Sequence, residues 1–230
     1  MYMKILEHLE KNTTPLTSSV IYDDFIKASE VSFDCKFTGQ SSFYPWKKPS
    51  NIPKDFKIGV IVGSSGSGKS TLLKEFGVEE SPEWDSIKSI LSHFDSPDDG
   101  INKLSAVGLN TIPSWYKPFH VLSNGEQFRA NLARKMKSNS VIDEYTSVVD
   151  RNVAKAASVS LSKYIKNSDI SGVVLSTCHY DILEWLEPDW VINTDTGEVI
   201  DGFFLLGQQS LSEYIARTTI LGDILKTIII

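Results

Sequence analysis

The amino-acid sequence predicts an α/β fold built on a mostly parallel sheet. The first observation is a buried-strand pattern at 56–62, without a charged residue from Ile58 onward, which ends in a loop of Gly and Ser and is followed by a helix-like segment. The second is a pair of further apolar runs, at 141–142 and 172–176, with a helical pattern at 153–165 between them. Continuous apolar strands that alternate with helices are typical of a parallel sheet covered on both faces. We therefore expect these runs to pair in the core.

The N-terminal part predicts two helical pieces followed by a small antiparallel β part at 31–62. Apolar residues recur at helical spacing in 3–9 and in 20–26, and a cluster of turn-forming residues separates the two segments. The stretch at 31–37 alternates between apolar and polar residues, which predicts a half-buried strand.

The middle of the chain predicts a short helical insert at 95–137. A short apolar run at 87–91 predicts a strand before it. Pro and Gly then surround one helical pattern at 101–107, and a second helix is predicted from 124 to about 137.

The C-terminal part predicts a hairpin and an extension. Two short apolar runs at 191–192 and 199–200 are joined through Asp195-Thr196-Gly197, which is typical of a β-hairpin. Residues 203–230 carry apolar side chains at helix-like spacing and form the predicted extension. We expect residues 1–230 to form a single domain.

Composition limits the class of protein. The chain has 230 residues, a net charge of −6 and a pI of about 5.3, so it lacks the overall basic character of a nucleic-acid-binding domain. Cys35 and Cys178 have neither zinc-site spacing nor a disulfide framework. The N-terminus does not resemble a signal peptide, and no apolar stretch approaches the roughly 20 residues of a membrane span. We expect a cytoplasmic protein that inserts no segment into a membrane.

The loop after the first strand has the Gly-x-x-x-x-Gly-Lys-Ser pattern of a phosphate-binding loop. Its glycines permit backbone angles closed to other residues, so N–H groups can converge on a phosphate at a helix N-terminus. Lys69 would bind the outer phosphates and the Ser70 hydroxyl would bind Mg²⁺. The candidate phosphate-binding residues are Gly63, Ser64, Gly66, Ser67, Gly68, Lys69, Ser70 and Thr71. The alternative is a Gly/Ser turn that fits the pattern by chance.

A carboxylate pair follows the apolar run at 141–142. Phosphoryl transfer to water needs a metal, charge neutralisation and an aligned nucleophile. Asp143 would hold Mg²⁺ through water, and Glu144 would orient or deprotonate the attacking water. An isolated Asp-Glu pair is more often a solvated turn, but its position after a strand and downstream of the loop favours the catalytic interpretation.

Taken together, these motifs resemble the ABC-type ATPase superfamily, over about residues 37–202. The phosphate loop is the first motif, and Leu122-Ser-Asn-Gly-Glu126 is similar to the family signature Leu-Ser-Gly-Gly-Gln. Val141-Ile-Asp-Glu144 resembles the Walker B strand, and Ser147-Val-Val-Asp150 resembles the loop that follows it. His179 stands where the family has its switch histidine. The resemblance implies a P-loop NTPase fold of the ABC type.

The family resemblance also implies a head-to-tail dimer that holds two ATP molecules. Ser123 and the Gly125 N–H would bind the γ-phosphate held by the other subunit, and His179 would contact the γ-phosphate. The signature departs from the family at Asn124 and Glu126. A plain N-capped helix, with Ser123 and Glu126 as a capping box, is the alternative, and it is compatible with the functional one.

Two features that the family leads us to expect are ambiguous in this sequence. The aromatic side chain that stacks on adenine has four candidates, Phe37, Phe43, Tyr44 and Trp46, of which we favour Tyr44 or Trp46. The usual glutamine before the helical insert is missing, and His93 is its best positional substitute.

Three functions remain open from the sequence. The residues of these motifs are similar to those of soluble ABC ATPases of bacteria and phages that occur alone or joined to GNAT acetyltransferase-like domains. This favours an ATP-driven dimerisation switch acting on an unidentified protein or nucleic-acid partner. The alternative is the ATPase subunit of a membrane transporter with a separate membrane chain, which co-purification with membranes would favour. A scaffold that binds ATP without hydrolysing it is disfavoured by Glu144 and His179.

A row of basic residues on the signature helix has two interpretations, a nucleic-acid-binding surface or an ordinary solvated helix face. These residues are Arg129, Arg134, Lys135 and Lys137.

Overall fold

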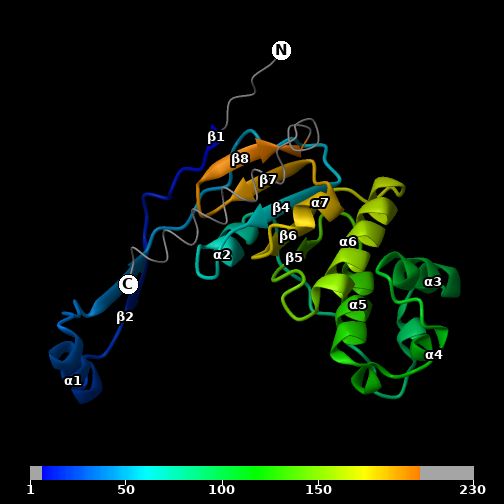
Figure 1. Cartoon of the computed structure of the whole chain (residues 1–230), viewed down its shortest axis with the longest axis horizontal. Coiled ribbons are helices and arrows are strands. Elements are labelled where there is room, and N and C mark those ends of the chain that lie inside the picture. Colours follow the sequence, from blue (N-terminus) through cyan, green and yellow to red (C-terminus); the bar gives the residue numbers. More distant parts are fainter. Residues whose placement is uncertain (1–6, 203–230) are drawn as a thin grey trace, which may run out of the picture.

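The computed structural model describes residues 7–202, which form a six-stranded sheet in the order β1-β8-β7-β4-β6-β5 (Figure 1). The strands are β1 (Glu7–His8), β4 (Ile58–Val62), β5 (Val141–Ile142), β6 (Val173–Thr177), β7 (Trp190–Asn193) and β8 (Glu198–Asp201). β4 pairs in parallel with β6 and β7, and β5 pairs in parallel with β6. β8 is antiparallel to β7 and β1, and it forms the predicted hairpin with β7. The mostly parallel α/β sheet is confirmed.

β4 lies at the centre and is buried on both faces, as its continuous apolar sequence predicts. Ile58, Val60 and Val62 face a core shared with α5 (Asn124–Lys135), α6 (Arg151–Lys166) and α7 (Ile182–Leu186). Ile61 faces the second core, with α2 (Lys69–Leu73) and Trp190. A Cβ on Gly59 would lie 2.0 Å from the Trp190 ring, so this position needs glycine for close packing. α2 ends at Leu73, and Lys74 is its C-cap.

Helical segments occupy residues 90–135 and lie beside α6 (Figure 1). They are η1 (Ile90–His93), α3 (Pro97–Ala106), α4 (Ile112–Trp115), η2 (Phe119–Val121) and α5. The strand predicted at 87–91 is wrong, because Ser89 caps a 3₁₀ turn and accepts the Ser92 N–H at 3.3 Å. No helix within residues 7–202 has both the length and the apolar content that a bilayer crossing requires.

The antiparallel N-terminal β part is confirmed, but its elements differ from those predicted. β2 (Leu16–Ser19) pairs with β3 (Gln40–Phe43), and α1 (Asp24–Phe33) lies between them. The Asp23 carboxylate caps α1 by accepting the N–H groups of Phe25 and Ile26 at 3.1 and 3.0 Å. This cap starts a helix that extends over residues 31–33 of the alternating segment, and residues 34–37 belong to no strand, so the strand predicted at 31–37 is wrong.

The other N-terminal prediction is wrong where it can be compared. Glu7–His8 is a strand that pairs with β8, so the predicted helix at 3–9 does not extend over these two residues. The helix predicted at 20–26 begins only at Asp24. The remainder of the 3–9 segment and the extension at 203–230 lie outside the described residues.

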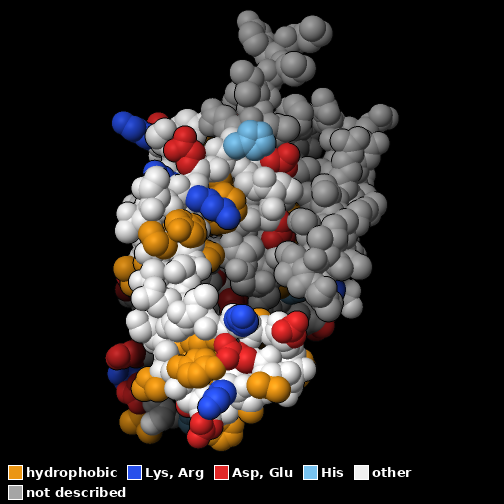
Figure 2. Space-filling model, turned by 90° about the vertical axis from the view of Figure 1, so that its left-hand side faces the viewer, with side chains coloured by type: hydrophobic (Ala, Val, Ile, Leu, Met, Phe, Trp, Pro, Cys, Tyr) orange, Lys and Arg blue, Asp and Glu red, His pale blue; other side chains and the backbone are white. Residues whose placement is uncertain are grey.

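α1 has no buried residue and presents apolar side chains at the surface. Phe25, Val31 and Phe33 are 85%, 84% and 80% exposed. Figure 2 views the molecule from the side on which α1 lies. The lower part of the figure shows apolar side chains mixed with charged ones. These side chains therefore contribute little to the stability of the described fold.

Candidate functional site

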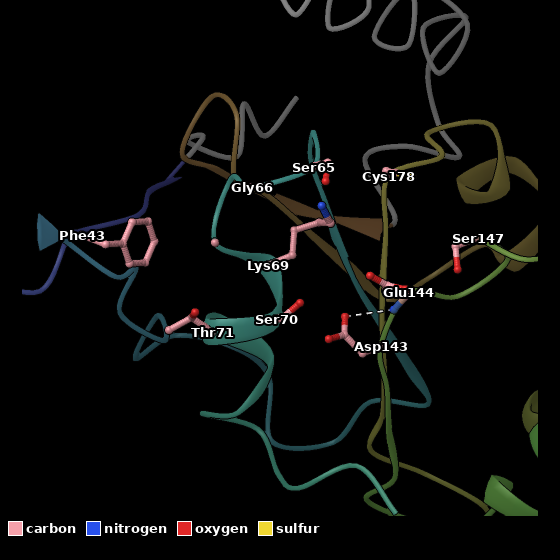
Figure 3. Close-up of a pocket in the computed structure, with 11 residues that line it drawn as sticks. Phe43, Ser65, Gly66, Lys69, Ser70, Thr71, Asp143, Glu144, Ser147 and Cys178 are labelled. Carbon is pink, nitrogen blue, oxygen red and sulfur yellow. Dashed lines mark hydrogen bonds between the residues drawn. The ribbon is translucent and has the colours of Figure 1, made fainter. Parts of the chain in front are cut away.

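A pocket of about 520 Å³ lies at the C-terminal ends of β4, β5 and β6 (Figure 3). Loops at the carboxyl ends of parallel strands are the usual place for ligand sites in α/β sheets. The loop after β4 contributes one wall and the segment after β5 contributes the opposite wall. The lining residues are Phe43, Ser65, Gly66, Gly68, Lys69, Ser70, Thr71, Asp143, Glu144, Ser147 and Cys178.

The loop between β4 and α2 has the shape of a phosphate-binding loop. Gly66 and Gly68 adopt φ of +82° and +96°, which favour glycine. The ring of Phe43 also packs close to Gly68, because a Cβ there would lie 2.8 Å from it. α2 starts directly after Gly68, so the N–H groups of Lys69, Ser70 and Thr71 belong to a helical first turn that lacks internal acceptors. The wall formed here offers backbone donors to an anion.

The predicted loop residues divide into two groups. Gly66, Gly68, Lys69, Ser70 and Thr71 line the pocket. Gly63, Ser64 and Ser67 lie behind it, on the side of the β7–β8 turn: the Ser64 hydroxyl donates to Asp195 at 2.7 Å, and the Ser67 and Thr194 hydroxyls lie 2.6 Å apart. The second group thus supports the loop from behind.

Lys69 is held by the loop itself. Its Nζ donates to the backbone oxygen of Ser64 at 2.7 Å. The side chain is half-buried and projects along the pocket wall (Figure 3). A lysine ammonium in this position is a point charge that can bind phosphate oxygens.

Asp143 and Glu144 follow β5 and face the loop. The Asp143 carboxylate oxygen Oδ1 accepts hydrogen bonds from the Ser176 hydroxyl and, at 2.9 Å, from the Glu144 N–H. Glu144 has φ of +49° and an exposed side chain that projects into the pocket (Figure 3). The left-handed conformation therefore separates the directions of two consecutive carboxylates.

The donor set fits a Mg²⁺ ion. The Ser70 hydroxyl and the Asp143 carboxylate line the same pocket, and Figure 3 shows the second carboxylate oxygen on the side of Ser70. Mg²⁺ prefers oxygen ligands, uses one or two protein groups, and keeps waters and phosphate oxygens for the rest. One hydroxyl and one carboxylate are therefore a sufficient protein contribution.

His179 lies at the margin of this group. Its Nδ1 lies 3.1 Å from the Thr146 hydroxyl, and its backbone N–H donates to the Thr177 hydroxyl at 3.1 Å. Burial lowers the pKa of the imidazole below its ordinary value, and the positive charge of Arg151 lowers it further, while Asp181 opposes the shift. The shift favours the neutral form of the ring, which can offer one N–H donor.

The signature segment forms the start of α5. Ser123 is the N-cap, and it forms a capping box with Glu126: the Glu126 N–H donates to the Ser123 hydroxyl at 3.4 Å, and the Ser123 N–H donates to Glu126 at 2.9 Å. Hydrogen bonds from the Ser114 hydroxyl and then from Ser123 lower the pKa of Glu126 to about 2. Ser123 and Gly125 do not line the phosphate pocket, and Ser123 is exposed. The helix start is thus presented to the outside.

Three further predicted site residues do not line this pocket. His93 does not line the pocket, because its Nε2 accepts the Asp85 N–H at 2.9 Å and its Nδ1 bonds the Ser89 oxygen at 2.9 Å. Trp46 donates its indole N–H to the Ser67 oxygen at 3.0 Å, and Tyr44 is 49% exposed. Neither lines the pocket, whose aromatic side chain is Phe43.

Sequence reasoning missed the supporting residues Ser176 and Asp195, and it named Phe43 only as one of four candidates for the aromatic side chain that stacks on adenine. Ser176 is a polar residue next to the end of the buried strand β6, and this is a signal for a functional strand end that can be read from the sequence. Three of the four basic side chains predicted on the signature helix have an ordinary explanation, because Lys135 and Lys137 pair with Glu79 and Glu80 at 2.6 and 2.5 Å, and Arg134 lies over the Trp84 ring. Lys137 lies beyond the end of α5.

Comparison with known proteins supports the fold. No protein-family model matches the sequence, and no curated protein matches it. The dimeric post-hydrolysis structure of the ATP-binding cassette MJ0796 bound to ADP and Pi matches with a TM-score of 0.50 at 15% identity, over 82% of this chain and 92% of that chain. A dimeric structure of MJ0796, described as a bacterial ABC transporter cassette, has a TM-score of 0.49 at 16% identity and covers 66% and 87% of the two chains. The chain therefore has the fold of the ABC-type ATPase cassettes.

Proposed function

We propose that this chain is an ABC-type ATPase that binds and hydrolyses Mg-ATP in a head-to-tail homodimer and thereby drives a conformational switch in a partner. One observation carries the proposal: Lys69 and Ser70 from one loop and Asp143 and Glu144 from another line a single pocket. These are the groups that bind phosphate, hold a metal and act on water. The dimeric, ADP-bound and Pi-bound cassette with the same fold supports it.

Each side chain has a separate role in the proposed reaction. The backbone donors of the loop and Lys69 bind the phosphates and neutralise their charge. Ser70 and Asp143 would hold Mg²⁺, which supplies charge neutralisation between the phosphates. Glu144 orients the attacking water and accepts its proton. His179 donates a hydrogen bond from its ring N–H to the γ-phosphate.

The dimer would complete the site. Ser123 and the Gly125 N–H stand at the exposed start of α5, outside the phosphate pocket of their own chain. A second copy arranged head to tail would bring this helix start to the nucleotide, where its N–H groups and dipole favour the γ-phosphate. Phe43, at the pocket edge, would stack on the adenine.

The charges of the chain favour a protein over a nucleic acid as the partner of the switch. The basic side chains Lys135 and Lys137 are already paired with carboxylates. The net charge of the chain is −6. Neither feature provides the cationic surface that phosphate-backbone binding requires.

The test combines light scattering with phosphate release. We expect Glu144→Gln to form an ATP-dependent dimer that hydrolyses at least about 100-fold more slowly than wild type, because the water is no longer activated. Adding Ser123→Arg should abolish that dimer without preventing ATP binding. ATP binding without a dimer, together with unchanged hydrolysis in Glu144→Gln, would refute the proposal. The chain would then be a nucleotide-binding protein with an ordinary phosphate-binding loop.

A further inference from the structure

The β7–β8 turn holds the phosphate loop from behind. The Ser64 N–H donates to both oxygens of Asp195, at 3.0 and 2.8 Å, and the Ser64 hydroxyl donates to Oδ1 at 2.7 Å. A Cβ on Gly63 would lie only 2.1 Å from the Thr194 hydroxyl, so loop and turn are in close contact. Three hydrogen bonds to one carboxylate fix the position of the first residues of the loop.

Asp195 is itself positioned by its surroundings. The Tyr180 hydroxyl donates to Asp195 Oδ2 at 2.8 Å, and the Asp195 N–H donates to Asn193 Oδ1 at 2.9 Å. Asn193 is fully buried. Tyr180 directly follows His179, so the loop that carries the histidine is joined to the phosphate loop through one carboxylate.

The connection continues to the lysine in the pocket. The same Ser64 whose N–H and hydroxyl bind Asp195 accepts the Lys69 ammonium on its backbone oxygen at 2.7 Å. A chain of hydrogen bonds therefore runs from Tyr180 through Asp195 and Ser64 to Lys69. Such chains fix donors and acceptors in one geometry, because each bond limits the next group.

We propose that Asp195, oriented by Tyr180, is a positioning residue for ATP: it fixes Ser64 and, through Ser64, places Lys69 and the loop for the outer phosphates. This role rests on the proposed ATPase function. Asp195 would influence ATP binding without contacting the nucleotide. The carboxylate acts by geometry, because its own negative charge would repel phosphate. Its geometric and electrostatic effects therefore have opposite signs.

That opposition makes the substitutions informative. Asp195→Ala removes the acceptors for Ser64 and should weaken ATP binding about tenfold, which corresponds to one charge-assisted hydrogen bond. Asp195→Asn keeps an acceptor oxygen for the Ser64 N–H and removes the charge, so ATP affinity should stay within about threefold of wild type. Tyr180→Phe keeps the ring and should weaken ATP binding about threefold.

The matched control is Thr196→Ala in the same turn. The Thr196 hydroxyl donates to Glu198 at 2.9 Å and accepts the Glu198 N–H at 3.3 Å, so these hydrogen bonds stay within the turn. We expect this variant to bind ATP as wild type does.

The experiment is calorimetric titration of each full-length variant with Mg-ATP and with AMP, together with the kcat and KM of hydrolysis and a thermal unfolding curve. Loss of affinity for ATP but not for AMP, with rescue by Asn, supports the positioning role. Equal ATP affinity in Asp195→Ala, Tyr180→Phe and Thr196→Ala would overturn it. If Asp195→Ala does not fold, Tyr180→Phe against Thr196→Ala decides. Failure of the wild-type protein to bind ATP would instead refute the proposed ATPase function.

Discussion

Gly125 offers a prediction in which stability and function move in opposite directions. It lies in the first turn of α5, and a Cβ built on it meets no heavy atom within 4 Å. Its φ is not among the positive values, so Ala fits the backbone. Glycine in a helix costs about 0.5–1 kcal/mol relative to alanine, and the cost in a first turn is near the lower figure. Gly125→Ala should therefore raise the free energy of unfolding by about 0.5 kcal/mol, or Tm by roughly 1–2 °C.

The same methyl group should weaken the ATP-dependent dimer. In the proposed dimer the Gly125 N–H contacts the γ-phosphate of the other subunit, and a Cβ would hold that phosphate away. Losing a hydrogen bond to a charged group costs about 1.5–3 kcal/mol, so dimerisation of Gly125→Ala/Glu144→Gln should weaken at least about tenfold.

Light scattering at a series of concentrations measures the dimer constant, and urea unfolding of the ATP-free monomer measures stability. Asn102→Ala, an exposed position in α3, is the control: it should give a similar gain in stability and an unchanged dimer. A dimer equally strong in both variants would refute the trans contact of Gly125. A loss of stability in Gly125→Ala would refute the structural reasoning.

Three further predictions follow from the described contacts. The pKa of Glu126 is lowered from 4.5 to about 2, so the stability it adds is present above pH 4.5 and is lost as pH falls to 2; acid unfolding of Glu126→Gln should lack this dependence. Phe25→Ser should leave the urea midpoint unchanged because Phe25 is 85% exposed, whereas Leu104→Ala, at 0% exposed, should cost about 2–5 kcal/mol. Ser176→Ala should raise the Mg²⁺ concentration needed for half-maximal phosphate release by about tenfold, because the hydroxyl orients Asp143.

The parts of the fold that could be predicted are the elements whose pattern of apolar residues follows directly from their burial in the core. β4 is buried on both faces, and its unbroken apolar run indicates this directly. α1 could not be predicted in the same way, because it buries no residue and its apolar side chains follow no core. The alternation of apolar and polar residues at 31–37 indicated a strand, whereas the helix that the Asp23 carboxylate caps continues to Phe33.

The parts of the site that could be predicted are those contained in one continuous segment. Lys69 and Ser70, and likewise Asp143 and Glu144, are local motifs. Phe43 reaches the pocket only through the pairing of β3 with a strand that begins at Leu16, so local sequence does not reveal its place. Ser176 meets Asp143 because β5 and β6 pair with Ile142 opposite Leu175, and this register is a property of the sheet.

The turn after β5 shows how the fold supports an unfavourable local conformation at the site. Glu144 and Thr146 both have positive φ, at +49° and +67°, and neither is glycine. Tyr145 between them is 1% exposed; its N–H donates to the Ser176 oxygen at 2.8 Å, and its oxygen accepts the Thr177 hydroxyl at 2.9 Å. Burial of this one ring and its two backbone bonds offset the cost of about 1–2 kcal/mol per left-handed residue. The buried tyrosine thus holds the exposed glutamate in the pocket, which explains why the carboxylate pair is not a freely solvated turn.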